Sequence, residues 1–487
     1  MPIDSIWIYS AIIIWFSAGC VLSHYARKRM GAGVAEYFIA NRRITALPSA
    51  MTYAATTYSA FMMVGLVGLT YALGSSTLGF ELTYLIGTVM LLLCFAPRIW
   101  IAGKRYGFIT PTEMLAKRFE NVWVGVVGTI ICAVMIIPYS SVQYMGIGYL
   151  VEELSGGSVP FIIGSLIVMF GVFVYAYWAG MRSVALTDIL QGFIMIATSL
   201  FLLFYVVYNF FGSWEAYVNN VRSTIPDHLK VRWGFASYIG LTIPWFFFAI
   251  SNPQVFQRCY IPNSVTTLKR MIWGFTIFGF IYTIICTQLG FMARLIIPEL
   301  KVADRAMPIL LTKVPDLVAL ITLVGILAAA ISTLNSIILT LSSMCGRDIY
   351  RALKPDVSEN KELFVGKALI PIFSIVCFFF ALFRPGLIAI LSAMSSGGML
   401  MLVPTIFATF FWKRATAIGA LSSMSVGALL VGIGYAFGIN PFGYSMTIWG
   451  LIVATFLLIT VSYMTKPPKI ADEFISYVNE KIKEHNM

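Results

Sequence analysis

Charged residues are scarce in this chain: Asp, Glu, Lys and Arg make up 11% of its 487 residues, whereas hydrophobic residues make up 59%. A soluble domain carries roughly 25% charged residues, so this scarcity excludes an ordinary water-soluble protein. Apolar runs such as 189–208 and 447–462 have the length scale of a membrane-spanning helix, about 20 residues. They lack the alternation that a closed barrel requires, so we expect an all-α polytopic membrane protein.

The residue types that build enzymatic and metal centres are also few. The seven cysteines lie in or beside apolar runs without metal-site or disulfide spacing, so we interpret them as small buried hydrophobes. His24, His228 and His485 lie near or beyond the ends of these runs, which argues against an imidazole proton relay. The sequence has no cluster of His, Cys or acidic residues, so it predicts neither an enzyme nor a cofactor. It also lacks a Walker motif, which argues against a primary pump.

Lys and Arg are distributed unevenly between the segments that separate the apolar runs. Most of the 33 basic residues fall on one side of the membrane if the N-terminus lies outside. The positive-inside rule therefore places the N-terminus outside and the C-terminus in the cytoplasm of a plasma-membrane protein. We predict about thirteen spans. They lie near 5–25, 46–73, 79–100, 123–151, 159–179, 184–210, 234–256, 270–297, 316–344, 366–384, 387–411, 417–438 and 444–464.

Polar groups inside spans are costly and therefore informative. Asp188 is the clearest carboxylate within a predicted span, and we expect it to bind a cation, to pair at a gate or to sit at the membrane interface. The spans 46–73 and 316–344 carry runs of small and hydroxylated residues. These runs suit either helix packing or an unwound helix whose carbonyls join hydroxyls around a sodium ion.

A second span, 234–256, also has the features of an interrupted helix. Pro244 and Pro253 each remove a backbone donor, and Ser251 and Asn252 could satisfy the groups that are freed. The two interrupted spans, 46–73 and 234–256, are the second and the seventh in the chain and so are five spans apart. Because five is odd, two five-span units that start at these spans would have opposite orientations in the membrane. This arithmetic predicts an inverted repeat.

At these residues the chain resembles the sodium:solute symporter family, which includes transporters of proline, pantothenate, sugars and sialic acid. The resemblance is carried by EYFIANRRITALPSAMTYAATTYSAF, AGMRSVALTDILQGF and AAAISTLNS followed by RDIY. It implies the leucine-transporter fold, with five-plus-five inverted helices after one additional N-terminal span. The expected organisation is an N-terminal helix and loop (1–45), two repeats (46–210 and 211–411), two further helices (412–465) and a solvated cytoplasmic tail (466–487).

The resemblance also implies site residues. The common sodium site would use carbonyls of Ala55, Tyr58 and Ala329 with the hydroxyls of Ser332 and Thr333. A second sodium site, or a gate in which Arg182 could pair with the carboxylate, would involve Asp188, Asn335 and Ser336, together with Ser332. The solute pocket would include Thr57, Ser59, Tyr139, Trp245 and Ala249. Thr57 stands where proline transporters have aspartate, and Ala249 stands where they have tyrosine.

The resulting hypothesis is sodium-coupled symport of a small organic solute across the lipid bilayer by alternating access. The solute would be an amino acid such as proline or a carboxylate such as pantothenate, and nucleic acid is not an expected partner. Two alternatives stay open: a proton-coupled symporter of the same fold, and a channel or sensor that does not accumulate solute.

Overall fold

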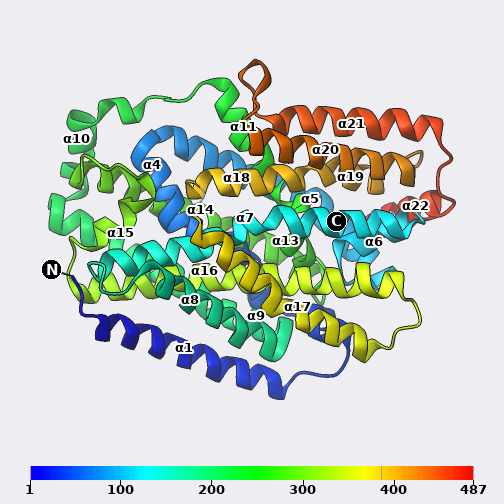
Figure 1. Cartoon of the computed structure of the whole chain (residues 1–487), viewed down its shortest axis with the longest axis horizontal. Helices are drawn as coiled ribbons and strands as arrows, with labels where there is room; N and C mark the ends of the chain where they lie inside the picture. Colours follow the sequence, from blue (N-terminus) through cyan, green and yellow to red (C-terminus); the bar gives the residue numbers. More distant parts are fainter. Residues whose placement is uncertain (1, 385, 486–487) are drawn as a thin grey trace.

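The computed structural model describes residues 2–384 and 386–485 and is built from helices that run roughly along one common direction (Figure 1). The long helices are α1 (Ser5–Lys28), α5 (Ser75–Tyr106), α7 (Val122–Leu154), α9 (Trp178–Val206), α14 (Val265–Ile296), α16 (Asp316–Met344), α17 (Glu359–Leu382), α20 (Ala417–Phe437) and α21 (Met446–Met464). Side chains cap several helix N-termini; Asp4 caps α1 and Asn121 caps α7, for example.

Shorter helices either form pieces of broken spans or lie in the connections. The pieces are α3 (Ala46–Thr57), η2 (Phe61–Leu66), α4 (Val67–Leu73), α8 (Phe161–Val172), η3 (Phe173–Tyr177), α11 (Phe235–Phe246), α12 (Phe248–Ser251), α13 (Pro253–Arg258), η7 (Cys345–Arg351), α18 (Ile388–Met399), η8 (Leu400–Leu402) and α19 (Val403–Phe411). The connections and termini hold α2 (Val34–Ile39), η1 (Ala40–Arg42), α6 (Pro111–Arg118), η4 (Val207–Phe211), α10 (Trp214–Thr224), η5 (Pro226–Leu229), η6 (Ala303–Arg305), α15 (Ala306–Leu311), η9 (Pro441–Gly443) and α22 (Ile470–Glu484).

The prediction of an all-helical polytopic membrane protein is confirmed. Within residues 2–384 and 386–485, ten helices are long and apolar enough to cross a membrane, or eleven if the bent pair Ala46–Thr57 and Phe61–Leu73 forms one span. The other two predicted spans coincide with shorter apolar helices, Phe161–Tyr177 and Phe235–Phe246. The second of these is short because it ends at Phe246, after which the chain continues as the separate short helices α12 and α13.

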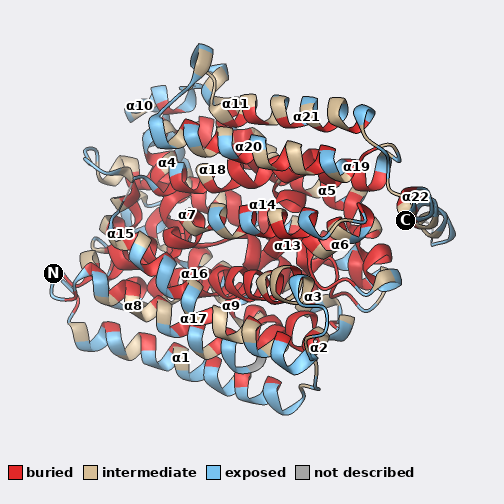
Figure 2. Cartoon of the chain, turned by 45° about the vertical axis from the view of Figure 1, so that its right-hand side comes forward, coloured by how far each residue is buried: buried red, intermediate tan, exposed pale blue. Residues whose placement is uncertain are grey.

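Burial separates a core from a periphery. In Figure 2 the helices at the centre are mostly buried, whereas α1 and α21 lie at opposite edges and expose much of their length. In the span Asp316–Arg351, which contains α16, 78% of the residues in the most apolar stretch of 18 are buried, compared with 22% in α1 and 28% in α21. Exposed apolar side chains suit helices that face lipid, so α1 and α21 flank the bundle while α16 belongs to its centre.

Two breaks in the core helices coincide with the predicted interruptions. Helix α3 ends at Thr57, Tyr58 is extended (φ −94°, ψ 108°), and the chain resumes as η2 at a bend of 49°. The second break lies at Asn252 (φ −91°, ψ 117°), directly before Pro253, whose ring cannot continue the preceding helix. At each break, backbone carbonyls lose their helical partners in the middle of the bundle.

Candidate functional site

Backbone carbonyls and hydroxyls meet where the end of α3 faces the middle of α16. The Ser332 Oγ lies 2.9 Å from the Ala55 carbonyl oxygen, and the Thr333 Oγ1 lies 3.0 Å from the same oxygen. The Ser332 Oγ is also 3.1 Å from the Ala329 carbonyl oxygen. The structure thus brings together four of the five predicted sodium ligands, all fully buried, and the fifth, Tyr58, is the extended residue that follows α3.

This oxygen cluster has the chemistry that a hard monovalent cation requires. It supplies neutral carbonyl and hydroxyl oxygens, and each hydroxyl can turn to offer a lone pair instead of its proton. Helix α3 packs against α16, and buried alanines lie near the contact on both helices, at 54–55 and 328–330; such small side chains let two helix backbones approach closely. We therefore call Ala55, Tyr58, Ala329, Ser332 and Thr333 the oxygen cluster.

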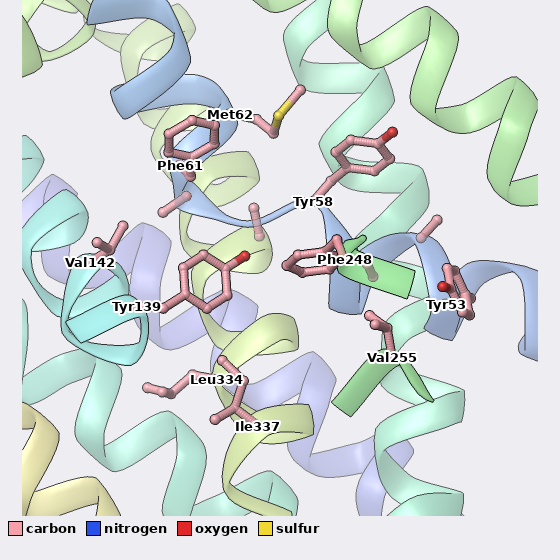
Figure 3. Close-up of a cluster of buried hydrophobic side chains, with 14 of the residues drawn as sticks. Tyr53, Tyr58, Phe61, Met62, Tyr139, Val142, Phe248, Val255, Leu334 and Ile337 are labelled. Atoms are coloured by element: carbon pink, nitrogen blue, oxygen red, sulfur yellow. The ribbon is translucent and has the colours of Figure 1, made fainter. Parts of the chain in front are cut away.

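Aromatic rings gather beside the same break. The rings of Tyr139 from α7 and Trp245 from α11 are 6.1 Å apart, edge to face. The Trp245 ring stacks on Phe61 at 5.3 Å and on Phe248 at 5.3 Å. Figure 3 shows the Tyr139 phenol directed at the unwound segment between Tyr58 and Phe61, with Phe248 beside it. Two of the predicted solute-pocket residues are therefore neighbours in a packed, buried cluster of rings. We call Phe61, Tyr139, Trp245 and Phe248 the aromatic pocket, after the solute site that the sequence predicts there.

The other predicted pocket residues have more varied environments. The Tyr139 hydroxyl donates to the Ser59 Oγ at 3.3 Å, so Ser59 joins the aromatic pocket. The Thr57 hydroxyl donates to the Tyr53 carbonyl of its own helix at 2.7 Å. Ala249 is fully buried in α12 and offers only a methyl group. Ser59 thus has a polar contact within the pocket, whereas the Thr57 hydroxyl is used locally.

A buried polar cluster surrounds Asp188. The Thr52 hydroxyl donates to the Asp188 Oδ2 at 2.6 Å, and the Arg258 Nε donates to the Thr52 Oγ1 at 3.2 Å. The same guanidinium donates to the Ser336 Oγ at 2.5 Å, and Ser336 also lies 2.7 Å from the Thr56 hydroxyl. Asp188 and Arg258 are both fully buried, so a carboxylate and a guanidinium share this cluster through Thr52.

The Asp188 cluster differs from the predicted gate in one partner. Arg182, which the sequence offers as one possible partner of Asp188, pairs with Glu36 of α2. Burial acts to raise the pKa of Glu36, but the hydrogen bond and charge of Arg182 outweigh it and lower that pKa. Asn335 lies in the same turn of α16 as Ser336, and among the described residues neither of its amide atoms has a hydrogen-bond partner.

Ion pairs join elements at both ends of the bundle. At one end, Arg305 pairs with Glu152 and Glu153, and η6 and α15 pack over α4 and η2. A Cβ on Gly68 of α4 would lie 2.6 Å from the Ala303 carbonyl oxygen, so the contact is close. We call Ala303–Leu311 the hairpin segment.

At the other end of the bundle, Arg347 pairs with Glu113 of α6 and Glu362 of α17.

Arg258 and Glu81 are among the buried charged residues that sequence reasoning did not single out. Arg258 lies two residues beyond the predicted span 234–256, and Glu81 lies two residues inside the predicted span 79–100. Both positions look interfacial in a linear sequence, yet both side chains are fully buried. For Arg258, the sequence did contain a signal, which is the short segment PQVFQR after Asn252. Because the helix breaks in the middle of the bundle, the residues that follow the break lie in the core.

The likeness to proteins of known function covers nearly the whole chain. The chain is 28% identical to a sodium/pantothenate symporter of Haemophilus influenzae over 85% of its own length and 87% of that protein. It is 25% identical to a sodium/proline symporter of Staphylococcus aureus, with 96% and 94% covered.

Solved structures show the same fold. A sodium-coupled sialic acid symporter superposes with a TM-score of 0.78 at 16% identity, covering 95% of this chain and 98% of the other. A nucleobase-cation-symport-1 family transporter gives 0.59 at 13% identity, with 91% and 98% covered. The leucine-transporter type of fold implied by the sequence is thereby confirmed. The sequence model of the Sodium:solute symporter family matches residues 37–427, so this chain belongs to that family of sodium-coupled membrane transporters.

Proposed function

We propose that this chain carries a small organic solute across the plasma membrane together with sodium bound at the oxygen cluster. The observation that supports it most directly is the position of the Ala55 carbonyl, which lies within 3.0 Å of the hydroxyls of both Ser332 and Thr333 at a helix break. Five neutral oxygens from two helices would ligate the ion, and the loosened backbone at Tyr58 would let the site form and dissolve.

The solute would bind in the aromatic pocket beside the oxygen cluster. Tyr139 and Trp245 supply rigid apolar walls with one hydroxyl and one indole N–H, a combination that suits a small ligand with a few polar groups. Ser59 adds a hydroxyl, while Thr57 is uncharged where proline transporters have aspartate, and Ala249 is smaller than the tyrosine that they have at its position. The sodium/proline and sodium/pantothenate relatives make an amino acid or a carboxylate the first candidates.

Coupling follows from the shared helix break. Residues 55–59 contribute to both sites, so ordering this segment around sodium also orders the wall of the pocket. Sodium and solute should then tighten each other's binding by the same factor, because coupling between two sites is reciprocal. The ion pairs of Arg305 at one end and Arg347 at the other would open in turn as access alternates.

For Asp188 we favour a role at the inner gate and one transported sodium ion. The Arg258 guanidinium shares Thr52 with Asp188 and contacts Ser336, so a positive charge already stands where a second sodium ion would need oxygen ligands. The competing assignment is a second sodium site made of Asp188, Ser332, Asn335 and Ser336. The unpartnered Asn335 amide and the second oxygen of Asp188 support that alternative.

The proposed membrane arrangement has thirteen spans. It counts α3–α4, α8–η3, α11–α13 and α18–α19 as single broken spans, with the N-terminus outside and the C-terminus in the cytoplasm. The organisation is then 1–45, two inverted repeats at 46–210 and 211–411, two flanking helices at 412–465, and a tail at 466–487.

Reconstituted vesicles test the function. With sodium outside and the purified protein in the membrane, radiolabelled proline or pantothenate should accumulate above its equilibrium level, and dissipating the sodium gradient should abolish the accumulation. Uptake driven equally by a proton gradient without sodium would favour a proton-coupled carrier. Equilibration without accumulation would favour a channel.

A further inference from the structure

A stripe of polar side chains runs along one face of α5. Its members are spaced four, three and four residues apart, which places them on the same side of a helix. They are Thr77, Glu81, Tyr84 and Thr88, and each is at most 1% exposed. Among residues 2–384 and 386–485, no side-chain oxygen of these four residues has a hydrogen-bond partner. We call these four residues the α5 stripe.

The α5 stripe borders the aromatic pocket. The Tyr84 ring lies 5.3 Å from Trp245 and 5.6 Å from Phe248, both edge to face. The Glu81 carboxyl lies within electrostatic range of the phenols of Tyr58, Tyr84 and Tyr139. The stripe therefore lies beside the rings to which the solute pocket has been assigned.

Unused hydrogen-bonding groups from other elements lie around the same place. The Trp245 indole N–H and the hydroxyls of Tyr58 and Tyr282 have no partner among the described residues. Tyr58 lies 6.3 Å from Tyr84 and 6.1 Å from Tyr282, ring to ring. Buried polar groups are ordinarily paired, so a concentration of unpaired ones beside a pocket indicates a ligand that would satisfy them.

Glu81 is the exceptional member of the α5 stripe because it can carry a charge. Neither of its oxygens accepts a hydrogen bond, and it forms no ion pair with a basic side chain of the described chain. A buried carboxylate without a partner is strongly destabilising, whereas one that meets a cation with donors can be retained. An ammonium group fits this requirement because it supplies both the positive charge and several donors.

We propose that Glu81 receives a cationic nitrogen of the transported solute and thereby selects amine-bearing solutes, such as amino acids, over anions that lack such a group. This proposal rests on the proposed function, since it names the solute class of the aromatic pocket. It separates the two kinds of relative: proline carries an ammonium nitrogen, and pantothenate does not. The Tyr84 and Tyr58 hydroxyls would serve the remaining polar atoms of the solute.

Matched ligand pairs test the proposal on the full-length protein in detergent. The probes are proline and tetrahydrofuran-2-carboxylate, which replaces the ring nitrogen with oxygen, then alanine and lactate, and pantothenate alone. Sodium-dependent binding is measured by calorimetry. We expect an amine-bearing probe to bind at least tenfold more tightly than its deaminated partner. In Glu81→Gln, loss of the charge should weaken the amine-bearing probe by about thirtyfold or more. The same substitution should also reduce the difference in affinity between the amine-bearing probe and its deaminated partner.

The variants separate selectivity from folding and from ion binding. Glu81→Asp keeps the charge and should retain part of the preference, and Glu215→Gln on the exposed helix α10 should behave as wild type. Sodium-induced thermal stabilisation should persist in Glu81→Gln. Tight pantothenate binding, or an unchanged preference in Glu81→Gln, overturns the proposal while leaving sodium-coupled transport intact. A loss of sodium stabilisation in Glu81→Gln would instead assign Glu81 to the ion. If no probe binds in a sodium-dependent way, the proposed function is contradicted and the assignment of Glu81 with it.

Discussion

Thr333→Ala should raise the sodium concentration that gives half-maximal uptake. The Thr333 hydroxyl is one of two side-chain oxygens in the oxygen cluster and lies 3.0 Å from the Ala55 carbonyl. Alanine keeps the helix and removes only this oxygen and a methyl group. The site is fully buried, so bulk water has no ready path to replace the lost ligand.

The size of the effect follows from one ligand lost out of five. Leaving a buried polar partner unsatisfied costs about 1–3 kcal/mol. Since every 1.4 kcal/mol is a factor of ten, the half-saturating sodium concentration should rise by roughly 5- to 150-fold. Ser332→Ala should have a comparable effect, because the Ser332 Oγ approaches carbonyls of both helices.

Initial uptake rates in vesicles over a range of sodium concentrations measure this shift. Thr322→Ala is a matched control, since Thr322 is buried in the same helix and its hydroxyl donates to the Val318 carbonyl of that helix at 2.8 Å. Thr333→Ser keeps the hydroxyl and should stay close to wild type. Wild-type sodium dependence in both Ser332→Ala and Thr333→Ala would refute the assignment.

The aromatic pocket, the Asp188 cluster and the hairpin segment each give a further expected outcome. Trp245→Ala should weaken solute binding at least tenfold, because it removes a stacked ring and an indole donor. If calorimetry shows that this variant binds solute with wild-type affinity, the pocket lies elsewhere. Sodium-to-solute flux ratios should be one in both wild type and Asp188→Asn; a fall from two to one would show a second sodium site. Burial raises the pKa of Asp304 to about 6, against the hydrogen bond from the Ile388 N–H. Protonation therefore favours the packed hairpin segment: this stabilisation is complete below the ordinary pKa of about 3.9 and is lost as the pH rises through 6. Lowering the pH from 7.5 to 5 should slow backbone amide hydrogen exchange in the hairpin segment by about tenfold, after correction for the intrinsic exchange rate, and Asp304→Asn should remove this dependence.

Local signals predicted the helices and the break after Thr57, whereas the ligand set of the oxygen cluster came from the family resemblance and stays a prediction. Clusters such as AATTYSA and AAAISTLNS mark both the break at Tyr58 and the hydroxyls that face it, because small and polar residues are unusual in mid-span. The partner of Asp188 was not predictable in this way. Arg182 is near in sequence, but the positive-φ turn at Gly180 (φ +56°) and the following helix direct it to Glu36, while Arg258 arrives from the second break.

The C-terminal tail illustrates the same limit. A solvated tail was expected after residue 465, but Ile470–Glu484 form helix α22, which is not solvated on every side. Phe474 stacks on Tyr106 at 5.3 Å and contacts Phe410, so one face of α22 packs on the bundle. The amphipathic spacing of Phe474, Ile475 and Val478 indicates a docked face, but one of the two partners, Tyr106, lies more than 350 residues earlier in the chain.

The hydrogen bonds at the Ala55 carbonyl also bear on the return of the carrier without cargo. The hydroxyls that would ligate sodium donate to backbone carbonyls at the break, so the unwound segment is tied to α16 by the same atoms in either condition. Loading the ion then requires little more than turning two hydroxyl protons aside, a local rotation with a low barrier. In such a carrier, Ser332 and Thr333 would hold the end of α3 against α16 during the return step as well.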